Sequence, residues 1–258
     1  MTAPLFRVNR DIASGCGTRI SQRIHYSAMD KEIHSGLSST SGIRFAIIST
    51  DAIVFMIRDK KLCTLVGKVR NNPFYPNHWA AIGGLVRPEE TAREAVARLL
   101  ADKAGIRNGY MEQLATFSGI HRDPRGRVVS VAYIVIVNDG DQRLDGAGVE
   151  TRWLPVGHLP RLAYDHNQIL TVATDRLRSR IEYTDIARHF LPREFTITEL
   201  QNVHQLVLGR ALDKRNFRKK AIASGLIRKL GKTRRKGVMR PAALYEFTHG
   251  KARGRNIL

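Results

Sequence analysis

Residues 84–106, GLVRPEETAREAVARLLADKAGI, contain a loop that leads into one helix with clear ends. Thr91 and Glu94 have the Thr-x-x-Glu spacing of a capping box, in which each side chain binds the backbone N–H of the other residue. No Gly or Pro interrupts residues 92–104, and Gly105 is a residue type that commonly ends a helix. We therefore predict a helix over residues 92–104.

Short apolar runs and helical segments alternate around this helix. We predict strands at residues 45–50, 52–57, 79–84 and 128–137, a type I turn at 123–126, and a helix at 165–178. The run at 128–137 is apolar almost throughout, which is typical of a strand buried on both faces. The alternation predicts an α/β domain over roughly residues 43–178. Residues 1–42 are rich in Ser, Gly and charge without periodicity, and we expect a poorly ordered arm there.

Positive charge is concentrated near the C-terminal end. The net charge is +20, and residues 181–258 hold 18 Lys and Arg against 6 Asp and Glu, a net charge of +12. This asymmetry predicts a second domain over residues 181–258 that binds a polyanion. No apolar run reaches the ~18 residues of a membrane span. Cys16 and Cys63 fit neither a metal-ligand spacing nor a disulfide framework, so we expect a cytoplasmic protein with no membrane partner.

Two short helices are predicted in this basic region. The first covers residues 198–208 and ends at Gly209, and Asp213 can cap a second over residues 214–223. On the second helix Phe217 and Ala221 share one face. Arg215 and Lys219 lie about 200° away from them at ~100° per residue, and Arg218 flanks them. Such a helix can pack by one side and present the other to a DNA major groove.

A basic hairpin is predicted after these helices. Residues 226–230 and 242–247 read as strands, and residues 231–237 form a basic turn between them. A hairpin of this kind can place its tip against phosphates without reading the sequence. The plain alternative is a solvated charge run, and RNA is disfavoured because no aromatic stacking platform is visible. The candidate DNA-binding residues are Lys214, Arg215, Arg218, Lys219, Lys232, Arg234, Arg235 and Lys236.

The loop and helix of residues 84–106 resemble the Nudix box, G-x5-E-x7-R-E-U-x-E-E-x-G-U, in which U is a bulky aliphatic residue. The positions that match are Gly84, Glu90, Arg98, Leu100, Gly105 and Ile106. The three acidic positions that hold metal in enzymes of that family are Leu99, Asp102 and Lys103 here. These three residues lie at i, i+3 and i+4 and so share one helix face.

The departures at Leu99, Asp102 and Lys103 bear on catalysis. Magnesium needs several oxygen ligands, which carboxylates supply, whereas Lys103 would put a positive charge where the metal should lie. We therefore expect a binding domain that is not an enzyme and that holds neither a metal nor another cofactor. The alternative is a divergent magnesium-dependent hydrolase of the ADP-ribose pyrophosphatase type that uses Glu89, Glu90, Glu94 and Asp102.

Segments farther along the chain resemble one subgroup, the Nudix-related transcriptional regulators of NAD metabolism (NrtR type). The similar segments are residues 153–155, 159–160, 162–170, 191–201, 212–220 and 240–245. The resemblance covers about residues 43–248. It implies an α/β Nudix fold, with a mixed sheet sandwiched by helices, followed by an α+β winged helix-turn-helix domain.

The resemblance also implies a function. Members of this family are dimeric repressors that ADP-ribose or a related nucleotide releases from DNA, and a palindromic operator would mirror the two-fold axis of the dimer. Related members control genes of sugar use instead. Candidate ligand residues are Arg87, Arg122, Asp123 and Tyr133. Each has a plain alternative, such as a surface charge for Arg87, a turn former for Asp123 and a core residue for Tyr133.

Overall fold

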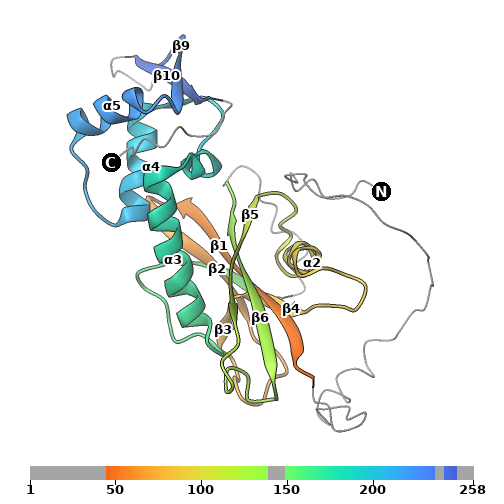
Figure 1. Cartoon of the computed structure of the whole chain (residues 1–258). Helices are drawn as coiled ribbons and strands as arrows, with labels where there is room; N and C mark the ends of the chain where they lie inside the picture. The colour runs from red at the N-terminus through yellow and green to blue at the C-terminus, as the bar shows by residue number, and fades with distance from the viewer. Residues whose placement is uncertain (1–44, 139–148, 236–240, 249–258) are drawn as a thin grey trace, which may run out of the picture.

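The computed structural model describes residues 45–138, 149–235 and 241–248, which form two parts connected by the long helix α3 (His166–Tyr183) (Figure 1). The expected arm at residues 1–42, the loop 139–148 and Lys236 lie outside the described residues. None of the helices in the described ranges is both long and apolar enough to cross a membrane.

The first part is built on one mixed sheet. Its strands are β1 (Ile47–Arg58), β2 (Lys61–Lys68), β3 (Trp79–Ala80), β4 (Ile82–Leu85), β5 (Tyr110–Phe117), β6 (Val128–Ile136) and β7 (Thr151–Pro155). The central strand β1 pairs in parallel with β6 and antiparallel with β2 and β4. On the outer sides, β5 pairs with β6, while β3 and β7 pair with β2.

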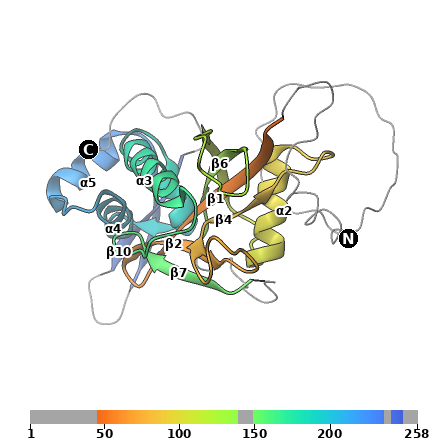
Figure 2. The same ribbon diagram turned by 90° about the horizontal axis from the view of Figure 1, so that it is seen from below.

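Helices cover both faces of this sheet (Figure 2). The helix α2 (Ala92–Ala104) lies on one face and α3 on the other. Successive side chains of a strand point to opposite faces, and β1 follows this rule. Ile53 and Phe55 belong to the core that includes α3, whereas Val54 and Met56 belong to the core that includes α2. The sheet is therefore buried on both sides near its centre.

The second part is a small helical unit with a three-stranded sheet. Its elements are η3 (Ile186–Phe190), β8 (Phe195–Thr196), α4 (Ile197–Leu208), α5 (Lys214–Ala223), β9 (Ile227–Arg234) and β10 (Ala242–Phe247). The strand order is β8-β10-β9. Thr196 and Glu199 form a capping box at the start of α4, and Gly209 ends that helix with φ 69°. Asp213 caps α5 by accepting a hydrogen bond from Asn216 N.

The two parts share one continuous apolar core. The cluster that holds Ile169 and Leu177 of α3 continues through Phe190 to Leu200 and Val207 of α4. A shared core makes the position of α3 matter to both parts, because closely packed interiors transmit small shifts.

Polar contacts reinforce this junction. Arg180 of α3 lies 3.2 Å from the carboxylate of Glu112 on β5. The ring of Tyr110 on β5 stacks on that of His189 in η3, with ring centres 4.3 Å apart. The strand β5 therefore contacts both α3 and η3, the first element of the second part.

Several predicted boundaries were wrong. The strand expected at 79–84 is divided into β3, which pairs with β2, and β4, which pairs with β1. The strands expected at 45–50 and 52–57 are one strand, β1, since Asp51 between them is buried and hydrogen-bonded within the sheet. Helix α3 continues past residue 178 to Tyr183 because its apolar face goes on to contact the second part at Ile181. The turn expected at 231–237 starts too early, because β9 runs through Gly231 to Arg234 while still paired with β10.

Candidate functional site

The loop before α2 is fixed by one ion pair. Arg98 Nε lies 2.9 Å from Glu90 Oε2, Arg98 Nη2 also contacts Glu90 Oε1, and the same nitrogen donates to Leu85 O. Glu90 Oε1 accepts a hydrogen bond from Arg87 N as well. The hydrogen bond from Arg98 holds the pKa of Glu90 below its usual range. Both oxygens of Glu90 are thus used to shape the loop.

The face of α2 that would carry metal ligands does not fit a divalent cation. Leu99 is buried against Gly84, where an added Cβ would lie 2.8 Å from Leu99 Cδ2. Lys103 Nζ donates to Gly83 O at 2.6 Å, and burial lowers the pKa of Lys103. Asp102 is exposed. Within the described ranges, no group of three or more His, Cys, Asp and Glu residues is arranged to hold a metal ion.

A buried polar cluster lies on β1, close to Gly83. Asp51 accepts hydrogen bonds from Ser130 Oγ at 2.6 Å and from Arg122 Nη2 at 3.1 Å, and His166 Nε2 lies 3.3 Å away. Ala81 N donates to His166 Nδ1, so in the neutral ring the proton is on Nε2 and points to Asp51. Burial alone would raise the pKa of Asp51, but these contacts outweigh it and hold that pKa well below its usual range.

This cluster connects the start of α3 to the sheet. Arg122 binds Asp51 on β1 and also forms two hydrogen bonds with Asp165, the residue before α3. Sequence reasoning missed the cluster, although an acidic residue inside the apolar run at 45–57 was a signal. The backbone at Gly83 is part of the arrangement, because an added Cβ there would lie 2.0 Å from Asp51 Oδ1.

The four expected ligand residues occupy different settings. Arg122 and Asp123 are adjacent in the loop between β5 and β6, where both are buried, and Asp123 pairs with Arg125 at 2.8 Å. Tyr133 is only 4% exposed and packs in the core with α2. Arg87 lies in the loop before α2 and is partly buried. The loop after β5 thus brings Arg122 and Asp123 together, whereas Arg87 and Tyr133 come from other elements.

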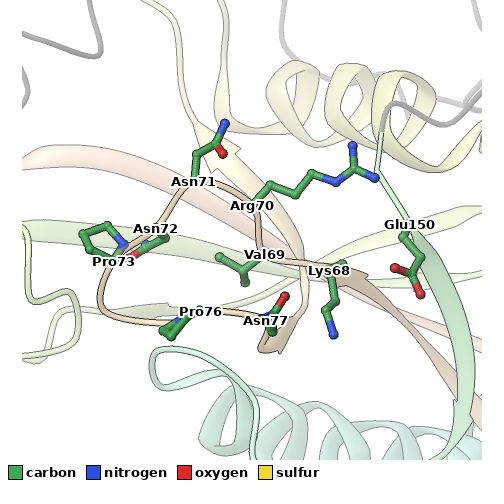
Figure 3. Close-up of a pocket in the computed structure, with 9 residues that line it drawn as sticks. All are labelled: Lys68, Val69, Arg70, Asn71, Asn72, Pro73, Pro76, Asn77 and Glu150. Atoms are coloured by element: carbon green, nitrogen blue, oxygen red, sulfur yellow. The ribbon is translucent and has the colours of Figure 1, made fainter.

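A surface hollow of about 670 Å3 lies at the loop between β2 and β3 (Figure 3). Its lining includes Lys68, Arg70 and Glu150, together with the asparagines 71, 72 and 77. The side chains of Lys68 and Arg70 point in different directions (Figure 3). Lys68 Nζ also lies 4.8 Å from the ring centre of Trp79. The hollow offers charged and amide groups suited to a polar ligand, and sequence reasoning did not find it.

The second part presents a cationic helix. On α5, Phe217 and Ala221 are 2% and 1% exposed and pack toward α4 and the core, as the sequence predicted. The basic residues of the same helix are Lys214, Arg215, Arg218, Lys219 and Lys220, and all are exposed. None of them forms an ion pair with any residue that the structure describes. This face can accept several phosphates or base edges at once.

The basic residues of β9 have a different environment. Lys232 Nζ lies 2.9 Å from Glu194 Oε1, and Arg234 Nη1 lies 3.0 Å from Glu199 Oε1. Arg235, which follows β9, is exposed. The expected basic hairpin is therefore present, but three of its cations already have carboxylate partners, since Arg228 pairs with Glu246 of β10.

Comparison with known proteins identifies both parts. The family model described as NUDIX domain matches residues 48–173, and the model described as NrtR DNA-binding winged helix domain matches residues 187–247. These matches confirm the predicted fold class, a Nudix fold followed by a winged helix domain.

Three relatives are informative. The chain is 32% identical over 206 residues to the ADPR-responsive transcriptional repressor NtrR of Acinetobacter baylyi, which covers 78% of this chain and 82% of that protein. It is 33% identical over 123 residues to the ADP-ribose pyrophosphatase of Methanocaldococcus jannaschii, 48% of this chain and 70% of that enzyme. The crystal structure of Shewanella oneidensis NrtR complexed with a 27mer DNA superposes with a TM-score of 0.70 at 31% identity, covering 81% of this chain and 98% of that one.

Proposed function

The chain belongs to the NrtR family of Nudix-related transcriptional regulators, and from this membership we propose that it is a ligand-responsive DNA-binding repressor. The observation that carries the proposal is the cationic helix α5, on which Arg215 and Lys219 lie opposite the buried face of Phe217 and Ala221. Lys214 and Arg218 of the same helix are exposed as well. Dense cations on a helix that is fixed by its other side suit a DNA major groove. Arg235, which follows β9, is exposed and adds to the basic surface.

The effector that we propose is ADP-ribose or a related nucleotide. Two relatives support this choice, since one is named as an ADPR-responsive repressor and the other as an ADP-ribose pyrophosphatase. The diphosphate of such a nucleotide would bind near Gly83, whose carbonyl Lys103 contacts from the last turn of α2, and Arg87 in the loop before α2 would supply further positive charge. Arg122 and Asp123 are buried in the loop between β5 and β6. They would transmit ligand binding to α3, because Arg122 donates hydrogen bonds to Asp165, the residue before that helix.

The regulated genes are proposed from the family resemblance. We expect genes of NAD metabolism, with genes of sugar use as the alternative. A homodimer would bind a palindromic operator, because a two-fold protein axis fits a two-fold DNA site. Such a regulator acts where the chromosome lies, in the cytoplasm.

We propose a binding role without catalysis for the Nudix part. Leu99 and Lys103 replace two carboxylates of the family motif, and Lys103 already contacts the carbonyl of Gly83. The similarity to an ADP-ribose pyrophosphatase favours the alternative, a hydrolase. Purified protein incubated with ADP-ribose and magnesium distinguishes the two, because turnover at ~1 s⁻¹ or faster, a typical enzyme rate, would contradict the binding role.

The DNA-binding role is tested by fluorescence anisotropy on duplexes from upstream of the gene for this chain and from NAD or sugar genes. We expect one of these duplexes to bind far more tightly than a scrambled duplex of equal length, with affinity that falls as salt is added. Equal binding to every duplex at physiological salt would contradict a specific regulator.

A further inference from the structure

Two cations of the strand β9, Lys232 and Arg234, reach acidic groups at the start of α4. Lys232 Nζ contacts Glu194 Oε1 at 2.9 Å, and that hydrogen bond lowers the pKa of Glu194. Arg234 contacts Glu199 Oε1 at 3.0 Å and donates a second hydrogen bond to Glu194 O at 2.7 Å. These partners are 35 to 40 residues away along the chain, so the fold itself brings them together.

The pairs are exposed to solvent. The side chains of Lys232 and Glu194 are 64% and 37% exposed, and those of Arg234 and Glu199 are both 41% exposed. Exposed ion pairs of this kind are weak, and another anion can replace one partner. On α5, by contrast, the cations form no ion pair within the described part of the chain.

We propose that Glu194 and Glu199 act as internal substitutes for DNA phosphates. In the DNA-free protein their carboxylates are paired with Lys232 and Arg234. The helix α5 therefore makes the first contacts with DNA. Lys232 and Arg234 contact phosphates only after the phosphates have replaced the carboxylates as their partners. The inference rests on the proposed DNA-binding function and deepens it. It assigns to two acidic residues a role in limiting affinity for any duplex, whatever its sequence.

This arrangement lowers affinity without changing the discrimination between sequences. Phosphate contacts add affinity on every sequence, whereas base contacts discriminate between sequences. By occupying two cations, Glu194 and Glu199 reduce the part of the affinity that is common to all duplexes. The affinity constants for the operator and for any other duplex therefore fall by the same factor, and the ratio between them stays unchanged.

The test is a pair of double-mutant cycles on the full chain. One cycle compares the wild type with Glu194→Gln, Lys232→Gln and the double variant, and the other compares Glu199→Gln, Arg234→Gln and their double variant. Glutamine also serves in a capping box, so Glu199→Gln keeps the helix start while removing the charge. Glu194 lies outside that capping box, so the first cycle does not depend on it. Asp175→Asn, which removes an exposed charge from an ion pair on α3, is the control.

The readout is duplex affinity as a function of salt concentration, on an operator and on a scrambled duplex. We expect Glu194→Gln and Glu199→Gln to tighten binding to both duplexes several-fold, and each to steepen the salt dependence by about one. Each effect should disappear when the partner cation is already replaced, and Asp175→Asn should have no effect.

Two results would overturn the inference. An equal gain in the presence and absence of the partner cation would show a general charge effect, and weaker binding in the glutamine variants would show that the carboxylates only position β9. Failure of the proposed function is distinguishable, because the wild type itself would then bind no duplex.

Discussion

Lys103 Nζ lies 2.6 Å from the carbonyl oxygen of Gly83. An ammonium group is therefore held on the helix face that carries the metal-binding carboxylates in the Nudix box. The same helix face carries the buried Leu99 in place of a carboxylate. A cation held in this way can meet a diphosphate directly, without a metal ion. The same contact therefore supports both the proposed loss of hydrolysis and the proposed retention of nucleotide binding.

Replacing Lys103 should impair the effector response and leave DNA binding intact. A hydrogen bond to a charged group contributes roughly 1.5–3 kcal/mol, so Lys103→Met should raise the ADP-ribose concentration needed for half-release of DNA by about ten-fold or more. Anisotropy titrations measure both quantities. Asp102→Asn, an exposed change one residue earlier, is the matched control. An unchanged ADP-ribose response in Lys103→Met would refute this role.

Gly83 should be essential for stability, because its missing side chain makes room for Asp51. In Gly83→Ala the Cβ would lie 2.0 Å from Asp51 Oδ1 and 2.7 Å from Thr50 O. Overpacking of this kind costs about 1–3 kcal/mol, and this contact with backbone leaves little room to relax. Urea unfolding of Gly83→Ala measures the loss. Gly157→Ala is the control, since a Cβ there meets nothing within 4 Å, and an equal loss in both variants would contradict the argument.

Local features of the structure could be predicted from the sequence, but contacts between distant segments could not. The capping box of Thr91, the helix 92–104 and the buried face of Phe217 depend on residues a few positions apart. The cluster at Asp51 depends on Arg122 and Ser130, which are 71 and 79 residues away. Side chains at such separations meet only through the sheet pairing, which periodicity alone does not specify.

The same limit applies to the candidate sites. The basic residues of α5 were found because charge and apolar faces alternate at helical spacing. The sequence gives no indication that Lys232 and Arg234 have carboxylate partners, since these come from segments 38 and 35 residues away. Tyr133 illustrates a related difficulty, because a tyrosine within a buried strand has the same sequence signature whether it faces a ligand or the core.

Arg215 and Lys219 should contribute most to discrimination between duplexes. A basic residue that reads a base edge contributes about 1–3 kcal/mol to the preferred sequence, so Arg215→Ala or Lys219→Ala should lower operator affinity more than scrambled-duplex affinity. Arg107→Ala, which removes an exposed cation from the Nudix part, should change neither. Equal losses on both duplexes would show that α5 contacts only phosphates.

The second part should lose stability in mild acid because of His204. This ring is fully buried on α4, its Nδ1 lies 2.9 Å from Leu200 O, and burial lowers its pKa from 6.5 to about 4. The unfolded chain then binds more protons than the folded chain between these values. Stability from neutral His204 is thus present above pH 6.5 and is lost as pH falls toward 4, on the order of 3 kcal/mol in total.

The check is urea unfolding at several pH values between 7 and 4. The variant His204→Leu should show a shallower decline in unfolding free energy over this window than the wild type. His189, whose pKa burial also lowers to about 4, remains in both proteins and accounts for part of the common decline. Identical pH dependence in the two proteins would rule out His204 as a source of acid sensitivity.

Release of DNA by the effector is tested by fluorescence anisotropy of the full chain on its operator duplex while ADP-ribose is added. A ligand can release DNA only if it binds the DNA-free arrangement more tightly, and the difference in affinity sets the size of the release. We expect tight, salt-sensitive binding that ADP-ribose reverses without being consumed. Binding that stays constant as ADP-ribose rises, or ADP-ribose that is hydrolysed while DNA stays bound, would contradict it.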